Sequence, residues 1–126
     1  MTQLLLDTNV VLWLSQDNPR ISDIKPLLLA EEVCIFISSV SWWEIAIKVR
    51  IGKLRVDLQK LLSMTKKYGY LELPMTSAYL QAYLELPLLH KDPFDHMILA
   101  QAMTCPMRLI TGDAILAEYS PLVMTV

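Results

Sequence analysis

Short apolar runs that alternate with longer helical patterns are the feature that most constrains the fold of this 126-residue chain. The runs are too short for helices and rich in aliphatic residues, which is typical of buried strands. We expect strands at residues 3–6, 33–37, 71–73, 109–111 and 122–126, and helices at 8–14, 22–31, 41–51, 57–68, 76–85, 93–103 and 114–118. This alternation predicts one α/β domain over residues 1–126, with a short parallel sheet flanked by α-helices.

Acidic residues stand at the crossings into the predicted helices. Asp7 and Asp113 each follow a strand-like run, Glu44 lies early in the helix after 33–37, and Asp95 opens the helix at 93–103. In an open parallel sheet the loops at the carboxyl ends of the strands form one crevice, so these side chains should meet there. Carboxylates gathered in one place repel one another unless a cation lies among them. The pattern therefore predicts a hard divalent metal ion and phosphate chemistry.

Each acid also has a simpler structural interpretation. An aspartate before a helix is a common N-cap, because its carboxylate accepts hydrogen bonds from the first backbone amides. Asp7, Asp92 and Asp113 could each be only a cap, and we assign Asp92 to capping alone because it directly precedes Pro93. Asp95 in a first helical turn is favoured by the helix dipole.

Glu44 has two structural interpretations of its own. Ser41 and Glu44 fit a capping box, in which the glutamate turns back to the first residue of the helix. Glu44 and Lys48 also form a favourable pair one helical turn apart. As a set the acids are less convincing as caps, because an acid rather than Ser, Thr or Asn stands at every relevant crossing.

Net charge and composition limit the kinds of partner that the chain can have. A net charge of −2 does not by itself indicate a nucleic-acid binder, although Lys48, Arg50, Lys53 and Arg55 form a basic stretch that either meets phosphates or is a solvated helix face. The hydrophobic fraction of 54% indicates an oligomer or a stable protein partner. No apolar run approaches the roughly 18 residues of a membrane span. Two cysteines without a short spacing are typical of free thiols in the cytoplasm, where we expect the protein.

Three segments in this order carry a resemblance to a known family. They are Leu4-Leu-Leu-Asp-Thr-Asn9, Ser38-Ser-Val-Ser-Trp-Trp-Glu-Ile-Ala-Ile-Lys48 and His90-Lys-Asp-Pro-Phe-Asp-His-Met-Ile-Leu-Ala-Gln-Ala102. Together they resemble a PIN domain, and more narrowly the VapC-type toxins of toxin–antitoxin pairs. The resemblance implies an endoribonuclease dependent on Mg²⁺ or Mn²⁺, a VapB-type antitoxin partner, an RNA substrate and a homodimer.

The resemblance also implies a role for each site residue. Asp7 and Asp95 are expected to bind one or two metal ions directly. Glu44 is expected to be a ligand or a base that positions water, and Asp113 a ligand or an acid that supports one. Asn9, Thr111 and Lys48 occupy positions that line the site or steer RNA.

The chain departs from the family pattern at two positions. Relatives commonly carry Arg at the position of His96, and Gly112 before Asp113 is less usual. Neither departure removes a carboxylate.

Two other functions compete with a nuclease. An aspartate-nucleophile phosphatase is discounted, because Asn9 stands where that chemistry needs a second carboxylate. The alternative from another class is an inactive PIN scaffold that binds RNA or a protein partner without cutting.

Overall fold

The computed structural model describes residues 2–16, 18–88 and 91–126 and confirms the predicted α/β fold. The elements in chain order are β1 (Thr2–Leu6), α1 (Thr8–Ser15), α2 (Arg20–Leu28), β2 (Val33–Ser38), α3 (Ser39–Arg50), α4 (Leu58–Lys67), β3 (Leu71–Leu73), η1 (Ser77–Tyr79), α5 (Leu80–Glu85), α6 (Pro93–Thr104), β4 (Arg108–Thr111), η2 (Ala114–Glu118) and β5 (Val123–Thr125). The expected helix at 76–85 is a short 3-10 segment followed by α5, and the helix expected at 114–118 is also 3-10.

The sheet has five parallel strands in the order β3-β2-β1-β4-β5. The central strand β1 pairs with β2 through Leu4↔Ile35 and with β4 through Leu5↔Leu109. The chain builds outward from β1 to β3 on one side and then crosses to β4 and β5 on the other. The order of the strands therefore reverses beside β1. In open parallel sheets this reversal, at the carboxyl ends of the strands, is where ligands bind.

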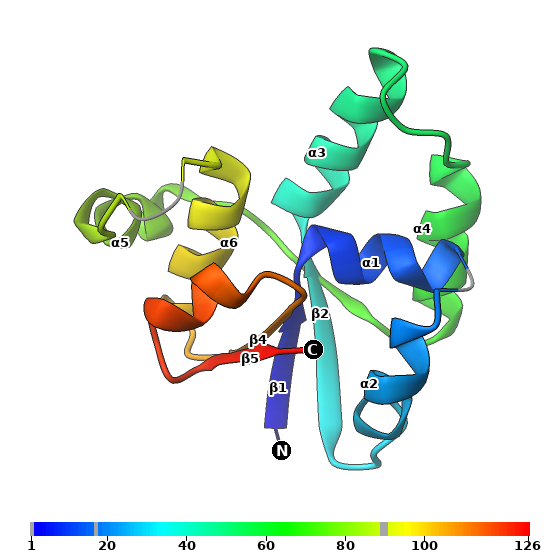
Figure 1. Cartoon of the computed structure of the whole chain (residues 1–126), viewed down its shortest axis with the longest axis horizontal. Helices are drawn as coiled ribbons and strands as arrows, with labels where there is room; N and C mark the ends of the chain where they lie inside the picture. The colour runs from blue at the N-terminus through cyan, green and yellow to red at the C-terminus, as the bar shows by residue number, and fades with distance from the viewer. Residues whose placement is uncertain (1, 17, 89–90) are drawn as a thin grey trace.

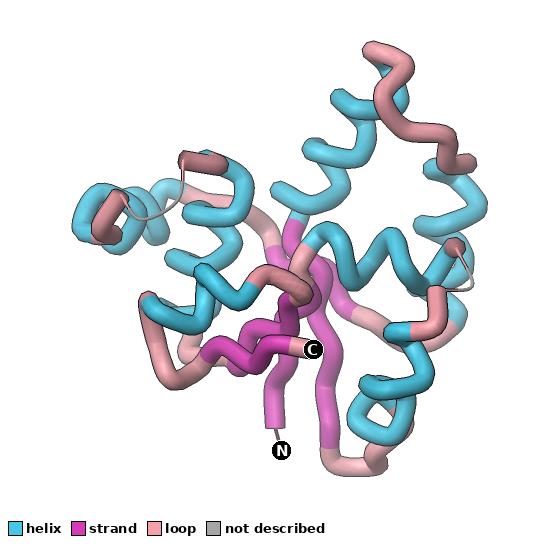
Figure 2. Tube along the Cα trace, in the orientation of Figure 1, coloured by secondary structure: helices cyan, strands magenta, loops and turns pink. Residues whose placement is uncertain are grey.

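Helices cover both faces of the sheet, with α1, α2 and α4 on one side and α5 and α6 on the other (Figures 1 and 2). The alternation of side chains along β1 explains the two layers. Leu4 and Leu6 pack into the core under α1, α2 and α4, whereas Leu5 packs into the core under α6. All three are fully buried, as parallel strands covered on both faces require.

Helix α3 lies at the carboxyl edge of the sheet and contacts α1 on one side and α6 on the other. It begins at Ser39, two residues earlier than expected, and the Ser38 hydroxyl caps it by accepting from the Val40 amide at 3.0 Å. The predicted capping box of Ser41 and Glu44 is therefore wrong. Gly52 ends the helix with a φ of 78°, a left-handed conformation that glycine adopts without strain.

Several large apolar side chains remain on the surface. Trp43 is 63% exposed, Leu84 73% and Leu88 84%, so the apolar surplus in the composition is not consumed by the core. Trp13, in contrast, is buried. Among the helices that the structure describes, none combines the length and apolar character needed to cross a membrane.

Candidate metal centre

Asp7 lies directly after the central strand and is buried, with 2% of its surface exposed. Its Oδ2 accepts a 2.5 Å hydrogen bond from the Thr111 hydroxyl at the end of β4. Asp7 occupies the N-cap position of α1, but its side chain makes no capping hydrogen bond, so the interpretation as a cap is wrong. Its other oxygen, Oδ1, is buried and accepts no hydrogen bond from the described residues.

Glu44 lies in the second turn of α3 and is also buried, with 4% of its surface exposed. The predicted pair with Lys48 is confirmed, because Lys48 Nζ donates to Glu44 Oε2 at 2.6 Å. This contact raises the pKa of Lys48 and keeps it charged. Oε1 of Glu44 is buried without a hydrogen-bond partner among the described residues, as is Oδ1 of Asp7.

A buried hydroxyl pair joins the helices that carry these two acids. The Thr8 hydroxyl, next to Asp7, donates to the Ser41 hydroxyl on α3 at 2.9 Å. Both side chains are buried, so the bond fixes the N-terminus of α1 against α3 one turn before Glu44. Sequence reasoning predicted Ser41 only as a cap and missed this bond, because its partner on α1 lies 33 residues away along the chain.

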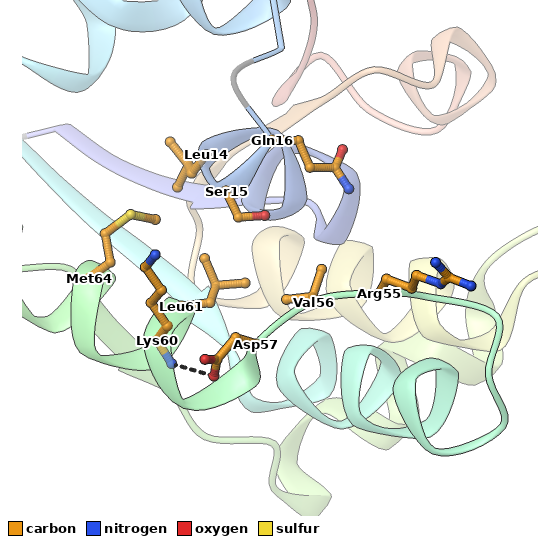
Figure 3. Close-up of a pocket in the computed structure, with 9 residues that line it drawn as sticks. All are labelled: Leu14, Ser15, Gln16, Arg55, Val56, Asp57, Lys60, Leu61 and Met64. Carbon is orange, nitrogen blue, oxygen red and sulfur yellow. Dashed lines mark hydrogen bonds between the residues drawn. The ribbon is translucent and has the colours of Figure 1, made fainter.

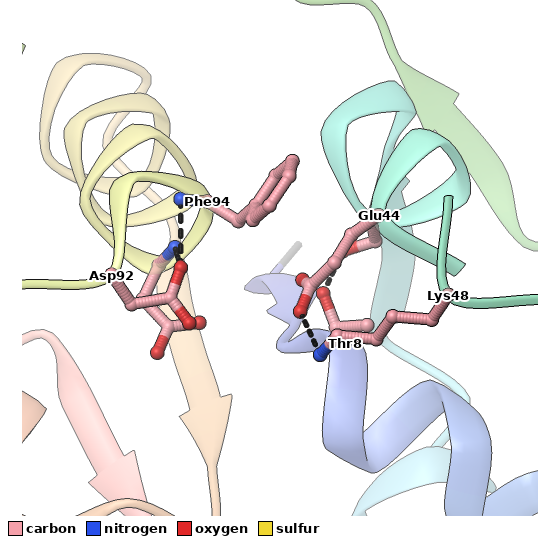
Figure 4. A network of polar contacts seen from close by, with 7 residues as sticks. Thr8, Glu44, Lys48, Asp92 and Phe94 are labelled. Atoms are coloured by element: carbon pink, nitrogen blue, oxygen red, sulfur yellow. Dashed lines mark hydrogen bonds and ion pairs between the residues drawn. The ribbon is translucent and has the colours of Figure 1, made fainter. Parts of the chain in front are cut away.

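Asp95 reaches the same edge from the opposite layer. Helix α6 leads into the amino end of β4, so its N-terminus lies at the carboxyl edge of the sheet. Asp92 caps the helix as predicted, accepting from the amides of Phe94 at 2.9 Å and Asp95 at 3.3 Å. Figure 4 shows Asp92 and Phe94 at the start of α6, opposite Glu44 and Lys48 on α3.

Asp113 and Asn9 lie at the margin of this group. Asp113 follows β4 and caps η2, because its Oδ1 accepts from the Ile115 amide at 2.9 Å, while its own amide donates to the Thr111 hydroxyl at 3.0 Å. The interpretation as a cap is thus confirmed for Asp113, and a second role as a ligand stays a prediction. Asn9 is exposed in the first turn of α1.

The electrostatics show that these acids share one region. Burial, followed by the charges of Asp7, Asp92, Glu44 and Asp113 in that order, together raise the pKa of Asp95 to about 8. Burial also raises the pKa of Asp7, against the hydrogen bond from Thr111, and the charge of Glu44 adds to the rise. Repulsion among carboxylates is what a bound cation would relieve.

The donor set suits a hard divalent cation, which prefers carboxylate oxygens. Two buried carboxylate oxygens without a hydrogen-bond donor, Asp7 Oδ1 and Glu44 Oε1, fit such an ion. As the side chains stand, no group of three or more His, Cys, Asp or Glu within the described ranges is arranged to hold a metal ion. The acids are therefore gathered at one edge without forming a closed ligand shell.

His96 is turned into the protein core next to this group. It is buried, its ring packs against Tyr83 and Tyr119, and its Nε2 lies 3.0 Å from the Tyr119 hydroxyl. The Tyr119 hydroxyl donates to the Pro87 carbonyl at 2.8 Å. His96 thus links α6 to η2 and to the segment after α5. His90 lies outside the described residues.

The comparisons with known proteins agree with this topology. The family model for the PIN domain matches residues 4–121. A search of curated protein sequences gives no match.

Solved structures of similar fold include VapBC2 from Rickettsia felis bound to a promoter DNA fragment, at 19% identity and a TM-score of 0.75, covering 99% of this chain and 98% of that one. A toxin–antitoxin complex from Klebsiella pneumoniae has 19% identity and a TM-score of 0.67, covering 97% and 96%. DNA-bound VapBC from Salmonella typhimurium has 20% identity and a TM-score of 0.64, covering 100% and 98%. With a family model that spans nearly its whole length, the chain belongs to the PIN domain family.

Proposed function

We propose that this protein is a metal-dependent endoribonuclease, the toxin of a VapBC-type toxin–antitoxin pair. The observation that carries the proposal is the pair of buried, donor-free carboxylate oxygens on Asp7 and Glu44, at the strand-order reversal of a PIN domain. Burying a carboxylate oxygen without a hydrogen-bond donor costs free energy. Proteins retain such buried oxygens at sites that bind metal ions.

The metal ligands would be Asp7, Asp95 and Glu44, with Asp113 as a fourth ligand or as an acid that supports one. Bound there, Mg²⁺ or Mn²⁺ supplies positive charge that activates water and stabilises the charge developing on a phosphodiester. Thr111 orients the Asp7 carboxylate, because its hydroxyl donates to Oδ2. Lys48 holds Glu44 from the solvent side and keeps one of its oxygens occupied.

The layer of α1, α2 and α4 carries a surface that is suited to bind a protein partner. A cavity of about 400 Å³ is lined by apolar Leu14, Leu61 and Met64 beside the cations Arg55 and Lys60 (Figure 3). An adjoining apolar groove of about 440 Å³ shares Leu14 and continues along α2. An antitoxin segment with apolar and acidic side chains would complement both. This assignment rests on the likeness to structures of toxin–antitoxin complexes.

The opposite layer carries an exposed apolar face. Trp43 on α3 stacks edge-on against Phe94 on α6, with ring centroids 5.5 Å apart, and remains mostly exposed. An apolar groove of about 620 Å³ runs beside this pair and is also lined by Met75 and Leu80. We propose this face as the homodimer interface, since it would bury side chains that are costly to expose.

Cleavage of total RNA by antitoxin-free protein tests the proposed activity. Wild-type protein is expected to cut RNA in Mg²⁺ or Mn²⁺ and to lose the activity in EDTA. Asp7→Asn, which keeps the size of the side chain, should abolish cutting while the protein stays folded. Asp57→Asn is the matched control, because Asp57 caps the distant helix α4 and is exposed.

Absence of cutting by folded, metal-loaded protein across RNA classes would overturn the proposal. Retained RNA binding in that case would support the inactive scaffold.

A further inference from the structure

Arg20, the first residue of α2, is held at a fixed place by a stacked aromatic ring. Its guanidinium carbon lies 5.1 Å from the ring centroid of Trp13 on α1. Trp13 is buried and therefore rigid, so the stack restrains an arginine that is otherwise exposed. A guanidinium held over an aromatic ring keeps N–H donors free of the ring, and its planar fork can bind a phosphate in bidentate fashion.

Gly112 brings this arginine against the candidate metal centre. A Cβ at position 112 would lie 2.8 Å from Trp13 Cη2 and 3.1 Å from Arg20 Nη1. Carbon atoms do not approach so closely, so only glycine lets the stack lie against this loop. The loop joins Thr111, which donates to Asp7, to Asp113, which caps η2. Arg20 therefore lies at the β4 side of the acidic group.

The charge around the centre makes such a cation useful. RNA phosphates would be repelled by the carboxylates that a metal ion does not fully neutralise. Lys48 is already engaged by Glu44. Within the described ranges, Arg20 forms no ion pair with any carboxylate. Its charge thus lies beside the Gly112 loop, and no ion pair among the described residues engages it.

We propose that Arg20 is an RNA-binding residue that contacts a backbone phosphate next to the cleavage position, held there by Trp13 and admitted by Gly112. The inference rests on the proposed nuclease function and adds a specific substrate contact to it. Arg20 neither binds the metal nor reacts, so its removal should weaken substrate binding more than it slows the chemical step.

The test is the affinity of a fluorescent phosphorothioate oligoribonucleotide, which resists cleavage, measured by anisotropy in Mg²⁺ at several salt concentrations. Arg20→Ala should weaken binding by about tenfold and lower the slope of log affinity against log salt by roughly 0.7, the value for one phosphate on a single strand. Arg20→Lys, which keeps the charge but not the planar fork, should keep most of the slope and lose part of the affinity.

Arg108→Ala is the matched control, because Arg108 is also exposed but lies at the amino end of β4, on the opposite edge of the sheet. It should leave affinity and slope unchanged. Arg20→Ala with wild-type affinity and slope would overturn the inference. That outcome differs from failure of the proposed function, in which wild-type protein cuts no RNA whatever the effect of Arg20.

Discussion

The hydroxyl of Thr111 makes two hydrogen bonds that Thr111→Val would remove without changing the shape of the side chain. It donates to Asp7 Oδ2 at 2.5 Å and accepts from the Asp113 amide at 3.0 Å. Thr111 is fully buried and Asp7 nearly so. Since Asp7 Oδ1 already has no hydrogen-bond partner among the described residues, the variant would remove the side-chain donor that the buried carboxylate has in the described part of the chain.

The expected loss of stability follows from these two bonds. A hydrogen bond to a charged group contributes about 1.5–3 kcal/mol, and a neutral one about 1 kcal/mol. In the variant, water replaces the Thr111 hydroxyl as the acceptor for the Asp113 amide. We therefore expect Thr111→Val to lower the free energy of unfolding of the metal-free protein by about 2–3 kcal/mol. For a domain of this size that is a fall in Tm of roughly 8–12 °C.

The loss should depend on pH in a defined direction. The bond from Thr111 lowers the pKa of Asp7 and so opposes the rise caused by burial. Its stabilisation is therefore largest where Asp7 is ionised in the folded protein and shrinks as the carboxyl is protonated in acid. Thr111→Val should thus differ most from wild type at high pH and least in acid.

Thermal and urea unfolding of the metal-free protein at several pH values measures this effect. Thr125→Val is the control, because Thr125 is the exposed partner of Thr111 in the register of β4 and β5. A Thr111→Val protein as stable as wild type at neutral pH would refute the view that this hydroxyl supports a buried, charged Asp7. The same loss at every pH would show that the lost contact does not involve the ionised carboxylate.

Two further predictions concern the neighbouring acids. Lys48→Met leaves Glu44 buried without its cation. It should lower the free energy of unfolding of the metal-free protein by about 1–2 kcal/mol, a value that already allows for the partial exposure of Lys48. Urea unfolding with and without Mg²⁺ should show a smaller loss when the metal is present. The pKa of Asp95 is raised to about 8, so metal binding must displace its proton at lower pH. Calorimetric titration should show Mg²⁺ affinity rising with pH up to about 8 and levelling above, and an affinity independent of pH would contradict this.

The sequence predicted those parts of the site that depend on where a strand ends. Asp7 and Asp113 follow buried apolar runs, and parallel pairing alone brings them to one edge. Glu44 also lies at this edge, although the capping box of Ser41 and Glu44 is wrong, because the hydroxyl of Ser38 caps the helix. The i,i+4 pair with Lys48 is local and was predicted directly.

The remaining features depend on contacts between distant segments, which the periodicity of the sequence does not predict. The close approach of Trp13 to Gly112 joins residues from α1 and the end of β4, and the cation of Arg20 comes from a third element. The structural role of His96, the position at which the chain departs from the family pattern, is likewise visible only in the fold, where its ring packs between Tyr83 and Tyr119. Nothing in the sequence around Gly112 or Trp13 indicates that these two residues pack together in the folded protein.

Binding of Mn²⁺, followed by the electron paramagnetic resonance signal of the free ion, tests the metal centre most directly. We expect wild-type protein to remove the signal saturably at one or two sites per chain, and Mg²⁺ to compete. Asp7→Asn should bind far more weakly, while the distant Asp57→Asn binds like wild type. No binding by the folded wild-type protein, or binding that Asp7→Asn leaves unchanged, would contradict a metal centre built on Asp7.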